Sequence, residues 1–310
     1  MAFEAGGEAV MRVAVAKYPI GMPRDFDEFA RRQADWLAEA KARGARIAVL
    51  PEYLSLELAA GFAPAVRDDL AASLAALQPL RRAWCALYRR LARELDLYIV
   101  PGTFLLATGS GRYRNRTDWF APDGFHGWQD KLQLTGYEKA SGVVEPGDAL
   151  YWFDCDGHRV GIAVCYDVEF PLPVRAQYEA GVRLLLVPSC TDTAAGATRV
   201  RVGCLARALE NRFFVAQAVT AGEALWSPAL DVNTGEATLY APMDHGFPAD
   251  GLLAVTEAGQ RWACSDVDID ALECSREHAQ VANDRDWPAQ LASPLPMLAA
   301  DGAVADTAEA

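Results

Sequence analysis

Most predictions about the fold and the reactive residues of this chain start from Gly-Ile-Ala-Val-Cys-Tyr-Asp-Val-Glu-Phe-Pro, residues 161–171. Four small or apolar residues lead to Cys165, and residues typical of a turn and a helix start follow it. This order indicates a buried strand that bends sharply into a helix. Such a bend exposes a side chain at the rim of a sheet, beside helix N–H groups that are free to bind an anion. Cys165 could therefore be a nucleophile, although a lone cysteine near the end of an apolar strand is more often a small core residue.

Strands and helices alternate on both sides of this segment. Apolar periodicity predicts strands at 11–15, 46–50, 97–100, 184–187 and 213–219, and helices at 26–44, 80–95, 173–180 and 198–209. Between the two halves, residues 113–121, 150–155 and 159–164 are expected to form consecutive strands joined by turns. Alternation of this kind predicts an α/β layered fold in which the halves pack against each other.

Composition excludes several classes of protein. The 310 residues are 52% hydrophobic and 23% charged, which is enough apolar surface for a core. The net charge of −13 repels phosphate backbones and anionic lipids, so we expect no nucleic-acid partner and no membrane partner. The longest charge-free run, residues 97–111, is too short to span a bilayer and contains a proline.

The cysteines and the N-terminus indicate a cytoplasmic protein. The seven cysteines are widely spaced and include no CxxC pair, and the four histidines include no HExxH motif. The first ten residues lack the basic and apolar regions of a secretory signal. We therefore expect a reduced compartment, no metal and no cofactor.

The chain divides into one long domain and a short tail. Residues 1–286 are expected to form the functional domain. Beyond Trp287 the sequence is rich in Ala, Pro and Asp with little periodicity, so residues 287–310 are expected to be mobile or bound at a subunit interface.

Three charged residues could take part in chemistry with Cys165. Glu52 follows the apolar run Val-Leu-Pro, where scarce water would raise the pKa of a carboxyl toward that of a base. Lys131 could stabilise a developing oxyanion as a fixed charge. Glu138, seven residues later, could orient that lysine. Taken singly, the three would be a helix N-terminal acid, a solvated surface lysine and an ordinary loop charge.

Together the four residues resemble the pattern of the carbon–nitrogen hydrolase (nitrilase) superfamily. The pattern is a glutamate after a strand and a proline, a lysine 79 residues later, a second glutamate, and a strand-borne cysteine followed by Tyr-Asp. The resemblance covers residues 13–286 and continues in Pro-Ser-Cys-Thr-Asp-Thr at 188–193 and Arg-Ala-Leu-Glu-Asn at 207–211.

The resemblance implies a fold, an assembly and a site. The fold would be a four-layer α-β-β-α sandwich of the nitrilase type, usually assembled as a homodimer or a larger homo-oligomer. The family's Glu-Lys-Cys triad falls on Glu52, Lys131 and Cys165, and its supplementary glutamate falls on Glu138. Glu145 is an alternative for that last role. No cofactor is implied.

The wording Tyr-Asp-Val-Glu-Phe-Pro after the cysteine is most similar to amidase-like members of the family. It implies hydrolysis of a small linear amide to an acid plus ammonia or an amine, through a cysteine thioester. Two alternatives stay open. The chain could hydrolyse nitriles through a thioimidate, or it could be a non-catalytic assembly protein that retains the fold, which an incomplete triad would favour.

Pocket residues are less clearly indicated than the triad. Tyr53, Tyr166, Asp192 and Trp226 lie next to segments that form the family's pocket, and each could instead pack in the core or at an interface. The negative net charge would disfavour anionic substrates, although Arg199 or Arg201 could reverse this near the pocket.

Overall fold

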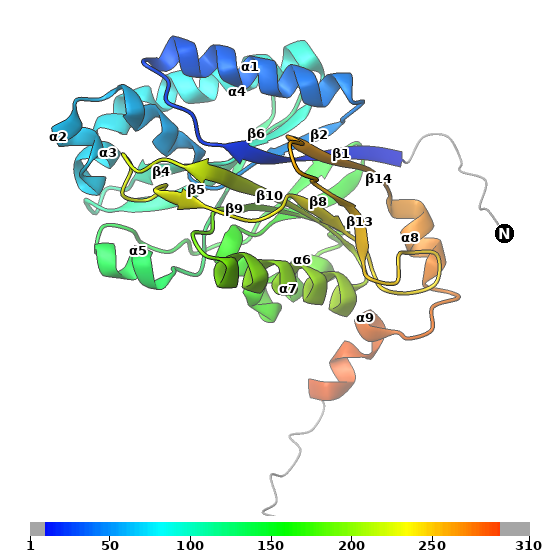
Figure 1. Cartoon of the computed structure of the whole chain (residues 1–310). Helices are drawn as coiled ribbons and strands as arrows, with labels where there is room; N and C mark the ends of the chain where they lie inside the picture. The colour runs from blue at the N-terminus through cyan, green and yellow to red at the C-terminus, as the bar shows by residue number, and fades with distance from the viewer. Residues whose placement is uncertain (1–9, 292–310) are drawn as a thin grey trace, which may run out of the picture.

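The computed structural model of the chain describes residues 10–291. Two layers of β-strands lie between helices that cover both outer faces (Figure 1). This confirms the expected α-β-β-α fold. The strands are β1 (Val10–Pro19), β2 (Ile47–Leu50), β3 (Tyr98–Pro101), β4 (Thr103–Ala107), β5 (Tyr113–Phe120), β6 (His126–Asp130), β7 (Trp152–Cys155), β8 (His158–Ile162), β9 (Leu184–Ser189), β10 (Phe214–Glu223), β11 (Val232–Asn233), β12 (Thr238–Tyr240), β13 (Leu252–Val255) and β14 (Trp262–Asp268).

The helices connect and cover these strands. They are α1 (Phe26–Ala42), α2 (Pro64–Arg67), α3 (Leu70–Leu77), α4 (Arg81–Leu95), α5 (Gly136–Ser141), α6 (Pro171–Glu179), α7 (Ala194–Asn211), α8 (Ile269–Ser275) and α9 (Asn283–Asp286). Short 3₁₀ segments are η1 (Leu54–Gly61), η2 (Gln78–Leu80), η3 (Cys165–Glu169) and η4 (Trp287–Leu291). Within residues 10–291, no helix combines the length and the apolar character needed to cross a membrane.

Strand β1 joins the two halves of the molecule. The strands follow the order β4-β5-β3-β2-β1-β10-β9-β8-β7, and β1 pairs in parallel with both β2 and β10. Strand β14 returns from the far end of the chain to pair with β1 antiparallel. The C-terminal third of the described chain is therefore tied to the first strand.

The side-chain pattern of β1 explains why two sheets are packed together. Val13 and Val15 contribute to one hydrophobic cluster, whereas Ala14, Ala16 and Tyr18 contribute to another. Because successive side chains of a strand point to opposite faces, β1 is buried on both. One face packs toward the other sheet and the other lies beneath α1 and α4.

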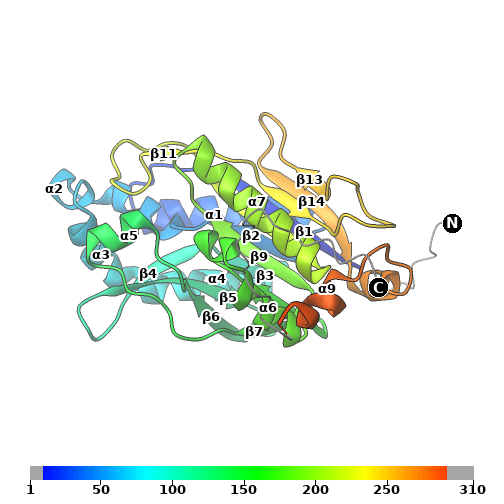
Figure 2. The same ribbon diagram turned by 90° about the horizontal axis from the view of Figure 1, so that it is seen from below.

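Helices α6 and α7 cover the opposite side of the molecule (Figure 2). Thr193 is the N-cap of helix α7, and its side chain accepts a hydrogen bond from the Gly196 N–H. The buried side chains of this helix include Val200 and Cys204. A polar N-cap satisfies a helix N–H group that would otherwise lack a partner. The helix therefore begins four residues before the predicted start at Thr198.

Most predicted elements are present with shifted ends, but several were missed. Strands β4, β6 and β11 to β14 have no counterpart among the expectations. Strand β14 has a burial pattern of two buried residues followed mostly by partly exposed ones. Its pairing with β1 joins residues about 250 positions apart, such as Val13 and Ser265. Local periodicity cannot reveal such a pairing.

The predicted tail lies partly outside the described residues. Residues 287–291 form η4, and the Arg175 guanidinium lies 5.2 Å from the centre of the Trp287 ring. Residues 292–310 lie outside the described residues. The domain boundary after residue 286 and the behaviour of the tail stay predictions.

Gly102 is a point where the fold requires glycine. It lies between β3 and β4 with φ +76°, and a Cβ there would lie 1.9 Å from the Pro51 carbonyl oxygen. Left-handed backbone and this close approach both oppose a side chain. We expect Gly102→Ala to lower the free energy of unfolding by more than ~2 kcal/mol, measured by urea denaturation.

Gly109→Ala is the matched control, because no heavy atom lies within 4 Å of a Cβ at that position. Its free energy of unfolding should stay within about 0.5 kcal/mol of the wild-type value. Equal stability of the two variants would show that the Pro51 backbone moves freely.

Candidate active site

Four side chains far apart in the sequence meet at one place. Glu52 follows β2, Lys131 follows β6, Glu138 lies on α5, and Cys165 begins η3. All four are at most 3% exposed. Glu52, Lys131 and Cys165 line one cavity of about 280 Å³, and Glu138 contacts the lysine behind them.

The Lys131 ammonium lies between two carboxylates. Its Nζ is 2.8 Å from Glu52 Oε1 and 2.9 Å from Glu138 Oε2. Burial by itself would lower the pKa of Lys131, but the charges of both glutamates and of Cys165 hold that pKa well above its ordinary value. Lys131 therefore stays charged and cannot serve as a base.

Glu52 is held by donors on both oxygens. Oε1 accepts from Lys131 and from Asn115 Nδ2 at 2.8 Å, and Oε2 accepts from the Cys190 N–H at 3.1 Å. Burial raises the pKa of Glu52, against the opposing effects of Lys131 and of a hydrogen bond from the Cys165 thiol. A buried carboxylate with a raised pKa beside a thiol is suited to accept its proton.

Cys165 sits at the predicted bend in a strained conformation. Its φ is +50°, a left-handed value that is unusual for any residue except glycine. Its Sγ lies 3.5 Å from the Cys190 carbonyl oxygen. Burial and the charge of Glu52 raise the pKa of the Cys165 thiol well above its ordinary value. The resting side chain is therefore a neutral thiol, which needs a base in order to react.

The sequence offered Glu138 and Glu145 as partners of Lys131, and in the structure Glu138 makes the contact. Its Oε2 accepts from the Thr135 backbone N–H at 2.9 Å in a capping box, and its Oε1 accepts from the Tyr53 hydroxyl at 2.7 Å. Glu145 instead bonds to Ser110 and Arg114 away from the cavity. Burial would raise the pKa of Glu138, but Lys131 outweighs burial and lowers it, so the carboxylate stays ionised.

Asp167 was not predicted as a site residue, yet it fixes two parts of the site together. Its carboxylate accepts from the N–H groups of Leu132 and Gln133, at 3.1 and 2.7 Å, and from the Val164 N–H at 3.2 Å. Leu132 follows Lys131, and Val164 precedes the nucleophile candidate. Asp167 therefore sets the position of Lys131 relative to Cys165. Its place in the motif, two residues after the cysteine, was the available signal.

Asn115 was also missed. Its Nδ2 donates to Glu52 at 2.8 Å and to Glu138 at 3.2 Å, so one amide bridges the two carboxylates that hold Lys131. Asn115 lies on β5, and nothing in its local sequence distinguishes it from a polar strand residue.

The predicted pocket residues divide into two groups. Tyr53, Tyr166 and Asp192 line the cavity. Trp226 is not among the lining residues and packs, partly buried, against the hydrophobic cluster beneath α1. Arg199 lines the cavity, whereas Arg201 does not.

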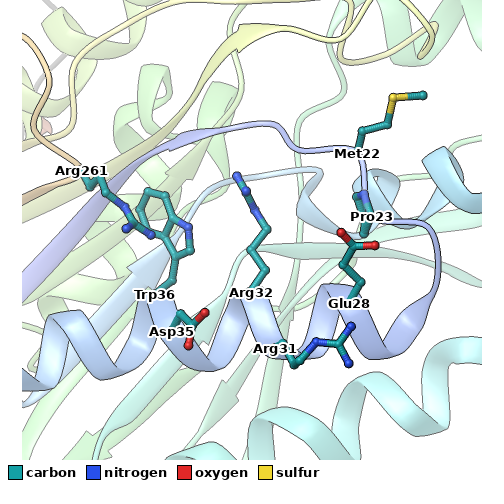
Figure 3. Close-up of a pocket in the computed structure, with 8 residues that line it drawn as sticks. All are labelled: Met22, Pro23, Glu28, Arg31, Arg32, Asp35, Trp36 and Arg261. Atoms are coloured by element: carbon teal, nitrogen blue, oxygen red, sulfur yellow. The ribbon is translucent and has the colours of Figure 1, made fainter.

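A larger hollow of about 420 Å³ lies over the outer face of α1 (Figure 3). The Arg261 guanidinium stacks 3.9 Å from the centre of the Trp36 ring and lies 3.0 Å from Glu39. Arg32 donates to the Tyr18 hydroxyl at 2.7 Å. These two arginines already have partners, and no cysteine lines the hollow, so it does not compete as a site for cysteine chemistry.

Within residues 10–291, the ligand atoms of Cys85, Asp118 and His126 form the one group compact enough to hold a metal ion. Arg81 donates to both Asp118 oxygens at 2.6 Å, and His126 contacts Asp118 at 2.9 Å and Arg89 at 3.4 Å. The two guanidinium groups occupy these acceptors and would repel a cation. The group therefore suits an ion-pair network better than a metal site.

The fold and the site geometry define a class of protein. A model of the carbon–nitrogen hydrolase family matches residues 12–270. The chain therefore belongs to the carbon–nitrogen hydrolase family, a family of enzymes. This confirms the resemblance that the sequence pattern indicated.

Individual relatives are similar at low identity. The probable hydrolase YhcX of Bacillus subtilis (strain 168) is 26% identical over 279 residues, which cover 89% of this chain and 53% of that protein. The chain thus spans about half the length of this relative. Omega-amidase NIT2 of Homo sapiens is 25% identical over 258 residues, covering 81% of this chain and 86% of that protein. A crystal structure of an amidase from Nesterenkonia sp. has a TM-score of 0.65 and 23% identity, covering 89% of this chain and 96% of that one.

The burial of Asp167 predicts a pH effect on stability. Burial raises the pKa of Asp167 to about 6, so the folded chain holds this proton more tightly than the unfolded chain. Between pH ~4 and pH ~6, rising pH therefore costs folding free energy through this group, and above pH ~7 the effect is constant. Relative to Asp167→Asn, the wild type should lose about 2–3 kcal/mol of unfolding free energy from pH ~4 to pH ~7.

Urea unfolding across this pH range measures the difference. The exposed Asp154 provides a control, because its carboxylate faces solvent before and after unfolding. Asp154→Asn should follow the wild-type curve. A constant difference between the wild type and Asp167→Asn would contradict the prediction.

Proposed function

We propose that this chain hydrolyses the C–N bond of small linear amides, giving an acid and ammonia or an amine through a thioester on Cys165. One observation carries the proposal: the Lys131 ammonium bridges Glu52 and Glu138 in the wall of a cavity that the Cys165 side chain also lines. Membership of the family supports it, as do relatives named omega-amidase and amidase.

Glu52 acts first as a base. The thiol is neutral at rest because burial and the charge of Glu52 raise its pKa. The proton must therefore pass from Cys165 to Glu52 as the sulfur attacks the amide carbonyl carbon. The sulfur–carbon bond forms, and the carbonyl electrons move onto oxygen to give a tetrahedral oxyanion.

Lys131 and the Tyr166 backbone N–H stabilise this oxyanion. An ammonium has three N–H donors, and the two carboxylates account for two of them. The third is available to the substrate in the cavity. Tyr166 is the second residue of η3, where backbone N–H groups have no partner inside the helix.

Glu52 next acts as an acid. It gives its proton to the departing nitrogen as the C–N bond breaks, and the carbonyl re-forms as a thioester on Cys165. The same carboxylate then takes a proton from a water molecule that attacks the thioester. Release of the acid returns the proton to the sulfur and restores the enzyme.

Glu138 keeps the charges of the site in balance. Without it, Glu52 alone would hold the buried ammonium, and protonation of Glu52 during the reaction would leave Lys131 without a counter-ion. An uncompensated buried charge is costly. Glu138 therefore lets Glu52 gain and lose a proton while Lys131 stays charged.

Two further proposals concern where and how the chain works. The seven cysteines are free, and a reduced cytoplasm is the compartment that suits them. Leu172 on α6 and Val202 and Leu209 on α7 are exposed on the outer face of the fold. Apolar side chains there are suited to packing against a second copy in a homodimer or larger homo-oligomer.

Intact-mass spectrometry during turnover of a pooled panel of small amides tests the proposal. We expect an acyl adduct on the wild-type chain that is absent from Cys165→Ala and present in Cys274→Ala, which removes an exposed free cysteine. An adduct that persists in Cys165→Ala would assign the nucleophile elsewhere.

Paired amide and nitrile substrates complete the test. Hydrolysis of nitriles alone would replace the amide proposal by nitrile hydrolysis. Failure to release ammonia from any amide, together with a Cys165 that does not react with an electrophile near neutral pH, would favour a non-catalytic assembly protein.

The two candidate glutamates give a sharp comparison. Glu138→Gln keeps the size of the side chain but removes the charge that balances Lys131, so we expect kcat to fall by about 100-fold. Glu145→Gln, away from the cavity, should change kcat less than about twofold. Steady-state kinetics on one amide measures both variants. Equal effects would remove Glu138 from the mechanism.

A further inference from the structure

The cavity wall beyond the catalytic groups is acidic. Glu169, Asp192 and Asp231 line it, and Arg199 is the cationic residue among the outer lining residues. The Arg199 side chain is 63% exposed, and its Nε lies 3.8 Å from Glu169 Oε1. Arg199 and Glu169 therefore offset each other, and two carboxylates remain.

Asp192 and Asp231 have no cationic partner in the described part of the chain, because no Lys, Arg or His nitrogen lies within 4.0 Å of either carboxylate. Both residues are exposed to solvent. The charge of Asp231 also acts on another lining residue: burial and then Asp231 raise the pKa of the Tyr137 hydroxyl.

Buried reactive groups at the inner end of the cavity indicate that it binds a ligand. They do not reverse the negative charge of its outer wall. Cys165, Lys131 and Glu52 are each more than nine-tenths buried and point into the cavity lining. Two carboxylates already contact the single inner cation. The two glutamates therefore neutralise the positive charge of Lys131 inside the site. This charge does not attract an anionic substrate to the mouth of the cavity.

We propose that the substrate is a short linear amide whose far end carries a positive charge, such as a primary ammonium or a guanidinium group. This inference rests on the proposed amide hydrolysis. The amide carbon would lie at Cys165, and the cationic end would lie near Asp192 and Asp231. A cavity of about 280 Å³ suits a small aliphatic chain, since pockets for drug-sized ligands span ~300–1,000 Å³.

Three amides of equal chain length test the inference: δ-aminovaleramide is cationic, hexanamide is neutral, and the monoamide of adipic acid is anionic. We expect kcat/KM to fall in that order, by about tenfold or more from the cation to the anion at low ionic strength. Added salt should reduce the difference, because it screens exposed charges.

Charge variants locate the effect. Asp192→Asn and Asp231→Asn should each reduce the ratio of kcat/KM for cation over anion by about threefold, and the double variant should reduce it further. Asp270→Asn removes an exposed carboxylate from α8, outside the cavity lining, and should leave the ratio unchanged.

The outcomes separate this inference from the proposed function. Equal use of the three amides, preference for the anion, or an unchanged ratio in both cavity variants would overturn the inference and leave amide hydrolysis intact. Hydrolysis of none of the three would overturn the inference, and amide hydrolysis itself would then depend on the pooled panel.

Discussion

The buried contact of the Lys131 ammonium with Glu52 and Glu138 is the constraint on which the rest of the structure depends. A charged amine this deep in a protein is stable only if opposite charges and hydrogen-bond acceptors surround it. The requirement joins the end of β2, the end of β6 and helix α5, and it brings together Glu52 and Glu138, which are 86 positions apart in the sequence. The charged groups of the site are therefore already in place before any substrate binds.

Hydrogen bonds from backbone and side-chain groups hold these charged residues in place. Asp167 binds the N–H groups that follow Lys131 and the one that precedes Cys165. Asn115 bridges the two glutamates. Left-handed backbone at Tyr53 and Cys165 turns the chain at the ends of β2 and β8. Strain of this kind persists where the surrounding structure holds it, and it is common at active sites.

The inner and outer parts of the cavity differ in their charges and in their proposed roles. The inner set holds one ammonium and two carboxylates, so in the proposed reaction the proton passes between Cys165 and Glu52 beside a lysine that stays charged. The outer wall is unbalanced, because Arg199 offsets only one of three carboxylates. In the proposed function, the inner groups carry out the reaction and the outer groups set the substrate preference. The hollow of about 420 Å³ over α1 has no cysteine in its lining, so cavity size alone does not identify a site (Figure 3).

The sequence by itself determined the alternation of strands and helices, the family, and the segments that carry Glu52, Lys131 and Cys165. These depend on local periodicity and on one motif, which neighbouring residues specify. Only the tertiary structure decided that Glu138 and not Glu145 contacts the lysine, that Trp226 lies outside the cavity lining, and that Asn115 and Asp167 belong to the site. It also decided the pairing of β14 with β1. The physical reason is that each of these depends on distances between segments remote in the chain, and such distances are set by packing of the whole molecule and not by local pattern.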